Sequence, residues 1–144
     1  MNTGERLLMI GGGLSAIVAL VHLGTIFIGG AAYRYLGAGE RMARMADRGA
    51  LAPIVITLGL TAMFAVWSAY AFSGARLLPP LPLLRPVLFG IGSIYAMRGL
   101  VLIPQIVWFA TGGAAALAPR HLFFSAVSLT LGVAYLVGTR LGLR

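Results

Sequence analysis

The sequence predicts an all-α fold: an integral membrane bundle of four transmembrane helices, with a short interfacial amphipathic helix between the first and the second. Of its 144 residues, 60% are hydrophobic and 10% are charged, and the mean hydropathy is +0.96. Soluble domains carry about 25% charged residues, so this composition is typical of a membrane protein. The apolar residues fall into four runs, each long enough to cross a bilayer as a helix. Residues 1–144 are therefore interpreted as a single transmembrane domain.

Short connections separate the four predicted spans, which cover residues 7–32, 52–74, 86–113 and 121–141. The first run is too long for the core of a signal peptide, whose start would also be basic, so it is interpreted as an uncleaved span. Pro53 suits the first turn of the second span. In the third span Pro104 removes a backbone amide donor, which predicts a kink just after Arg98.

The segment between the first two spans predicts the interfacial helix, over residues 39–48, with Gly49 as its C-terminal stop. A helix that separates apolar from basic residues lies in the membrane interface, and the three arginines of this one are predicted to contact lipid head groups. The apolar stripe is Ala38, Met42, Met45 and Ala46, and the basic stripe is Arg41, Arg44 and Arg48.

Local contacts of this segment are also predicted. Arg44 is spaced to pair with Glu40 at i,i+4 and with Asp47 at i,i+3. Tyr33 and Tyr35, just before the helix, are expected at the head-group level.

The basic residues are all arginine: eleven arginines and no lysine contribute to a formal net charge of +8. They occur singly at the ends of the apolar runs, where they reach phospholipid head groups, and no dense basic cluster indicates nucleic-acid binding. Five arginines fall at each end of the predicted bundle, so the positive-inside rule gives no orientation. We expect a multi-pass protein of the bacterial inner membrane with both termini in the cytoplasm, as in most even-spanning bacterial proteins.

Several kinds of chemistry are excluded by what the sequence lacks. There is no cysteine, which rules out disulfides, thiolate metal sites and iron–sulfur clusters. No residue spacing marks a metal site or a nucleophile–base pair. We therefore predict no catalytic residue, no metal and no cofactor other than a bound lipid.

Arg98, near the middle of the third span, is the charge that needs an explanation. An ionised side chain at the bilayer centre costs about 2.5–3.5 kcal/mol on insertion scales, which makes it a functional candidate by default. Its guanidinium fork suits an anion, a carboxylate or a lipid head group. The alternative is structural, with Arg98 bonded to carbonyls freed near Pro104 or to Glu40. No acidic residue lies within a span, so a counter-charge comes from a loop, a partner or a ligand.

Other polar side chains gather in the half of the bundle that carries the interfacial helix, which predicts a polar cavity ending near Arg98. His22 is interpreted either as a proton shuttle or, more simply, as a hydrogen-bond partner of a neighbouring helix. The candidates for ligand or partner binding are Arg98, His22, Gln105, Glu40, Thr57, Thr61 and Ser125.

Three stretches carry a resemblance to known proteins: HLG followed by GGAAYRYLGAGERMA, the link from SGA to PLPLLR, and IYAMRGLVLIP. They resemble small four-span proteins of unknown role in bacterial inner membranes, over most of the chain, and the resemblance implies no activity. Three other four-span families differ from the chain. Small multidrug exporters carry a carboxylate in the first span, membrane glutathione transferases carry acidic and asparagine residues in their helices, and small fluoride channels carry asparagine in the second span.

These observations leave three classes of function open. The favoured one is an accessory or binding subunit that packs against a larger membrane complex or a lipid through a polar site centred on Arg98. The alternative is a small homo-oligomeric channel or transporter for anionic or amphipathic solutes. The third, and least favoured, is a membrane enzyme acting on lipid or quinone. The predicted partners are membrane lipids and either a larger membrane-protein complex or further copies of the chain.

Overall fold

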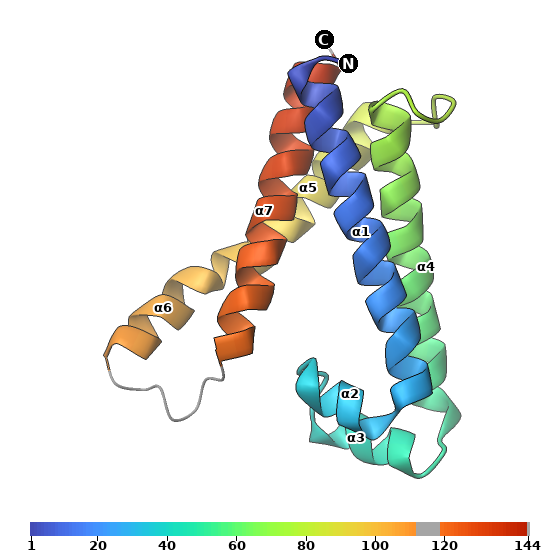
Figure 1. The fold of residues 1–144 in the computed structure, drawn as a ribbon, viewed down its shortest axis with the longest axis vertical. Helices are drawn as coiled ribbons and strands as arrows, with labels where there is room; N and C mark the ends of the chain where they lie inside the picture. The colour runs from blue at the N-terminus through green and yellow to red at the C-terminus, as the bar shows by residue number, and fades with distance from the viewer. Residues whose placement is uncertain (112–118, 144) are drawn as a thin grey trace. The chain divides into compact units, whose positions relative to one another are not determined.

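The computed structural model describes residues 1–111 and 119–143, and its fold is the all-α one predicted (Figure 1). Four long apolar helical segments, Thr3–Ile28, Leu51–Gly74, Leu84–Ala110 and Pro119–Gly142, have the length and hydropathy to cross a membrane. The predicted end of the third span at residue 113 lies outside the described residues, and so does most of the predicted connection 114–120, whose last two residues begin the fourth segment. The helices are α1 (Thr3–Ile28), α2 (Gly30–Tyr35), α3 (Glu40–Asp47), α4 (Leu51–Gly74), α5 (Leu84–Leu100), α6 (Leu102–Ala110) and α7 (Pro119–Gly142).

The chain forms two compact units, and α1 and α4 contribute to both. The first unit consists of Met1–Gly12 and Ala69–Arg144, and the second of Gly13–Ser68. The first therefore holds the start of α1, the end of α4, and all of α5, α6 and α7. The second holds the rest of α1 and α4 with the short helices α2 and α3.

The first unit is built on the antiparallel packing of α5 against α7, which lie side by side in Figure 1. Glycines let the two backbones approach closely, as is common between membrane helices. A Cβ added to Gly132 would lie 2.6 Å from the backbone N of Ala96, and one added to Gly99 would overlap the backbone of Leu129. Because the partner numbers fall along α7 as they rise along α5, the helices run in opposite directions.

Leu8 ties the start of α1 into this unit. Its side chain is fully buried and is the nearest contact for a Cβ placed on Gly74 of α4 or on Gly138 of α7. Nearer the start of α1, Gly4 lies against the backbone of Gly142 so closely that a Cβ would overlap it. The start of α1 and the end of α7 consequently lie next to each other (Figure 1).

The third span is broken, as Pro104 predicts. The helix α5 ends at Leu100 and α6 begins at Leu102, with Val101 between them. Proline has no amide hydrogen to donate to the carbonyl of Leu100, so the helical ladder is interrupted at this level. Beyond the break, α6 buries none of its side chains.

In the second unit, α1 ends earlier than the predicted limit of the first span. Gly29 has a φ of 80°, a left-handed conformation that favours glycine, and it turns the chain from α1 into α2. The predicted first span (7–32) therefore includes this turn and the first residues of α2. At the other end of the segment, the prediction for α3 is confirmed. Gly49 closes the helix with a φ of 70°, its N–H donating to the carbonyl of Ala46.

Candidate functional site

Arg98 lies near the middle of the helical segment Leu84–Ala110 and is exposed on the surface of α5. Its Nη1 donates a hydrogen bond to Oγ of Ser125 on α7, at 3.1 Å. Ser125 is fully buried, so the guanidinium reaches from the exposed side of α5 to the edge of the α5–α7 contact. The structure thus brings together two of the residues that the sequence singles out.

The direction of the Arg98 side chain follows from the register of the two helices. Gly99 lies opposite Leu129, and Ser125 is one helical turn, about 6 Å, further toward the start of α7. The guanidinium is therefore directed along the bundle toward the break at Val101. It lies where α5 gives way to α6, the helix without buried side chains.

The three acidic side chains of the chain (Glu5, Glu40 and Asp47) are all engaged with other arginines. Arg34 pairs with Glu40 at 2.9 Å and with Asp47 at 2.8 Å. Arg76 pairs with Glu5 at 3.0 Å. The expected pairs of Glu40 and Asp47 with Arg44 are thus replaced by pairs with Arg34. Glu40 is thus already paired within the second unit.

Gln105 lies on α6, beyond the break that follows Arg98. Its Oε1 is buried and has no hydrogen-bond donor among the described residues. An unpaired buried acceptor costs about 1–3 kcal/mol, so native structures seldom leave one without a partner. Among the described residues, Gln105 therefore leaves one buried polar atom of the third span without a partner.

In the second unit, Thr57 belongs to a hydrogen-bonded cluster centred on Tyr33. The Tyr33 hydroxyl donates to the carbonyl of Pro53 at 3.2 Å and lies 2.9 Å from Oγ1 of Thr57. Tyr33 is buried, so it fastens α2 to α4, and its predicted place at the head-group level stays a prediction. Thr61 donates to the Thr57 carbonyl at 2.9 Å, an ordinary back-bond within α4. Both threonines therefore have structural partners.

His22 is half-buried on α1. Its Nδ1 lies 2.8 Å from the carbonyl oxygen of Val18 in the same helix; because a carbonyl only accepts, Nδ1 is the protonated nitrogen. The imidazole ring packs against Phe64 of α4, with 4.9 Å between ring centroids. The contact with the neighbouring helix is thus aromatic, and the hydrogen bond stays within α1.

The ion pairs of Arg34 hold α2 and α3 together. The hydrogen bond from Arg34 lowers the pKa of Glu40 below its usual value, and the same bonds to Glu40 and Asp47 raise the pKa of Arg34. All three side chains are partly exposed, so water screens the attraction. Arg41, Arg44 and Arg48 project from α3 and are exposed.

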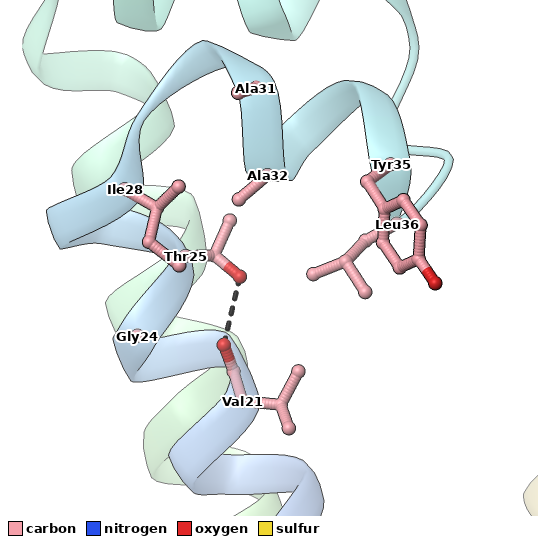
Figure 2. A pocket seen from close by; sticks show the side chains of 8 residues that line it. All are labelled: Val21, Gly24, Thr25, Ile28, Ala31, Ala32, Tyr35 and Leu36. Carbon is pink, nitrogen blue, oxygen red and sulfur yellow. Dashed lines mark hydrogen bonds between the residues drawn. The ribbon is translucent and has the colours of Figure 1, made fainter.

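An apolar groove runs between the end of α1 and α2, with a volume of about 540 Å³. Figure 2 shows Val21, Thr25 and Ile28 from α1 facing Ala32 and Leu36 across it. The Thr25 hydroxyl donates to the Val21 carbonyl at 2.8 Å, so it offers no free donor to a ligand. The groove is lined mainly by apolar side chains.

Sequence reasoning missed three residues that organise charge in the structure: Glu5, Arg34 and Arg76. Only Glu5 could have been found from the local sequence, because an N-cap residue such as Asn2 followed three positions later by Glu is typical of the start of a helix. The pairs of Arg34 and Arg76 join separate helices, and no spacing along one helix reveals such contacts.

Comparison with known proteins gives no matching family model, curated protein or solved structure. The resemblance to small bacterial inner-membrane proteins therefore remains a prediction. The chain is a small membrane protein with four spans, and its function has to be inferred from the chemistry of its own residues.

Proposed function

We propose that the chain is a membrane-embedded binding protein whose Arg98 pairs with an anionic group supplied by another molecule. The anion is the carboxylate of a partner subunit, which makes the chain an accessory subunit of a larger complex, or the phosphate of a lipid. The observation that carries this proposal is the commitment of all three acidic side chains to Arg34 and Arg76. No carboxylate side chain of the chain is left for Arg98.

The energies support a partner for this arginine. A cation in the middle of a span costs about 2.5–3.5 kcal/mol on insertion scales. The single hydrogen bond from the charged guanidinium to the Ser125 hydroxyl contributes about 1.5–3 kcal/mol, which does not exceed that cost. Bonds to a charged acceptor contribute about 1.5–3 kcal/mol each, and a bidentate guanidinium–anion pair makes two of them.

The surroundings of Arg98 are suited to such a partner. No residue of the neighbouring helix α6 is fully buried, although one side-chain atom of Gln105, its Oε1, is buried and lacks a donor among the described residues. A partner helix with one carboxylate would reach the exposed Arg98 guanidinium and pair with it. The apolar side chains of α6 do not distinguish a protein from a lipid, because acyl chains cover them equally well.

The test is native mass spectrometry of the protein extracted from its own membrane in polymer-bounded lipid discs. We compare wild type with Arg98→Leu and with the control Arg85→Leu, which removes an exposed arginine from the first turn of α5. Wild type and the control should retain the same anionic companion, and Arg98→Leu should lose it. Arg98→Lys should retain part of it, because lysine keeps the charge without the fork.

The mass of the companion distinguishes the two sources. A polypeptide in constant ratio identifies a subunit, and replacing its intramembrane acid with the amide should cause the same loss as Arg98→Leu. A phospholipid mass identifies a lipid phosphate. An Arg98→Leu protein that inserts, folds and keeps every companion in the wild-type ratio overturns the proposal.

The alternative is a small homo-oligomeric channel or transporter for anionic or amphipathic solutes. A second copy brings no spare carboxylate side chain, because its acids form the same ion pairs. An oligomer with clustered Arg98 side chains would therefore attract mobile anions from water. Copies of the chain alone, together with an anion flux into vesicles that Arg98→Leu abolishes, would favour this alternative.

A further inference from the structure

We infer that the chain binds one anionic phospholipid at α3, with the phosphate on Arg41 and part of an acyl chain in the cleft between α3 and α4. The cleft has a volume of about 330 Å³. It is lined by Ala38, Arg41, Met42, Met45 and Ile56. This site is separate from Arg98 and does not depend on the function proposed for that residue.

The charges around the cleft are complementary to an anion. Arg34 engages both acidic residues of α3, Glu40 and Asp47. Arg41, Arg44 and Arg48 are exposed and form no ion pair with these acids among the described residues, so their charge is left in excess. Only Arg41 among them also lines the cleft, so it is the one positioned to hold a phosphate while a chain attached to that phosphate enters the cleft.

The lining is suited to hydrocarbon. Met42 and Met45 are half-buried and present flexible thioether side chains, which adapt to irregular apolar ligands. They belong to the apolar stripe of α3, the face that an interfacial helix turns toward the acyl region. Ala38, just before α3, is small enough to leave the cleft open.

The cleft lies near the start of α4, the second of the four apolar segments. The helix α4 begins at Leu51, and Ile56 is five residues, about 7.5 Å, further along it. Interfacial helices bury their apolar face about 5–10 Å into this boundary. A ligand that spans Arg41 and Ile56 therefore needs a charged end and an apolar end, as a phospholipid has.

The larger groove beside α2 (Figure 2) makes a useful contrast. Its lining includes no charged residue. Any acyl chain can cover it, and it offers no means of selecting a head group. The selectivity for an anionic lipid comes from Arg41.

The experiment uses the full-length protein in lipid discs of phosphatidylcholine with increasing phosphatidylglycerol, and counts retained lipids by native mass spectrometry. Wild type should hold one phosphatidylglycerol per chain. Arg41→Gln should weaken this binding about tenfold, the effect of losing one charge-assisted contact. The matched control Arg48→Gln removes the same charge from α3 outside the cleft and should change the affinity less than about twofold.

A second variant tests the apolar half of the site. Ala38→Phe fills the cleft and leaves every charge in place, so it should also weaken phosphatidylglycerol binding. Equal losses in Arg41→Gln and Arg48→Gln would mean diffuse electrostatic attraction and would overturn the proposal. So would full binding by Ala38→Phe, or displacement of the lipid by inorganic phosphate alone.

Discussion

Arg76 pairs through its Nε with Oε1 of Glu5 at 3.0 Å, joining the end of α4 to the first turn of α1. The Glu5 side chain is 8% exposed, whereas that of Arg76 is 74% exposed. The other carboxylate oxygen of Glu5 accepts the backbone N–H of Asn2, and the Glu5 N–H donates to Oδ1 of Asn2, both at 2.9 Å. This reciprocal arrangement is a capping box, so one carboxylate both starts α1 and links it to α4.

The backbone at Arg76 helps to orient its side chain. Its φ is 61°, a left-handed conformation that is costly for a residue with a Cβ. Its N–H donates to the carbonyl of Ser73, and the next N–H, of Leu77, donates to the carbonyl of Phe72. These two bonds form a Schellman motif, in which glycine would be the usual residue at this position.

The first prediction concerns this carboxylate. Glu5→Ala should lower the free energy of unfolding by about 1–2 kcal/mol, because the capping box loses its reciprocal half and the Asn2 N–H loses its acceptor. The exposed guanidinium of Arg76 contributes little of this, since water screens it. Circular dichroism of thermal unfolding in detergent micelles measures the change. Glu40→Ala is the control, and equal shifts of the midpoint in the two variants would contradict the role of Glu5.

The second prediction uses two glycines of α5 that differ only in their surroundings. A Cβ on Gly99 would overlap the backbone of Leu129, whereas one on Gly90 would meet no atom within 4 Å. Gly99→Ala should therefore destabilise the α5–α7 contact by about 1–3 kcal/mol, as overpacking does in well-packed interiors. Gly90→Ala should leave stability unchanged or slightly increased, since alanine favours helix.

The same unfolding measurement compares both variants with wild type. Cross-linking between cysteines introduced in pairs on α5 and α7 provides a second readout, because it reports the helix separation directly. If Gly99→Ala unfolds and cross-links like Gly90→Ala, the close approach of α5 and α7 at this level is wrong.

The parts of the fold that sequence reasoning predicted are those set by local chemistry. Pro104 has no amide hydrogen, so it interrupts the hydrogen bonds of a helix whatever the helix packs against. The helix accordingly breaks at Val101. Gly49 ends α3 because glycine adopts the left-handed conformation that a helix end requires. The apolar stripe with Met42 and Met45 is likewise a property of helical spacing, and these residues line the cleft beside α4.

The parts that sequence reasoning missed depend on contacts between elements. The turn at Gly29 divides a continuous apolar run, and hydropathy does not record a change of direction. Tyr33 is buried because α2 folds against α4. There its hydroxyl donates a hydrogen bond to the Pro53 carbonyl and lies within hydrogen-bond distance of Oγ1 of Thr57. At the Arg98 site, the midspan charge was evident from the sequence, but its bond to Ser125 required the register of α5 against α7.

The third prediction concerns the pH dependence of the pairing between α2 and α3. The hydrogen bond from Arg34 lowers the pKa of Glu40 from its ordinary value of 4.5. The folded state therefore binds this proton less readily than the unfolded state does. The pair contributes its full stabilisation above pH 4.5 and loses it as the pH falls through the lowered value. The pair would also weaken if Arg34 lost its proton. Because the pKa of Arg34 is raised, that loss requires strongly alkaline solution.

The measurement is the ¹³C chemical shift of the Glu40 carboxyl, followed through an acid titration in neutral phosphatidylcholine discs. With two glutamates and one aspartate in the chain, the three side-chain signals are readily assigned with single variants. The Glu40 midpoint should lie below 4.5 in wild type and return toward that value in Arg34→Gln. Arg44→Gln is the matched control. Arg44 lowers the pKa of Glu40 only through its charge, and this effect is smaller than the hydrogen bond and the charge of Arg34. Removing Arg44 should therefore move the midpoint less than removing Arg34. A midpoint that is the same in wild type and Arg34→Gln would show that Arg34 does not hold α3 through Glu40, and the pairing of α2 with α3 would then rest on Asp47 and on packing.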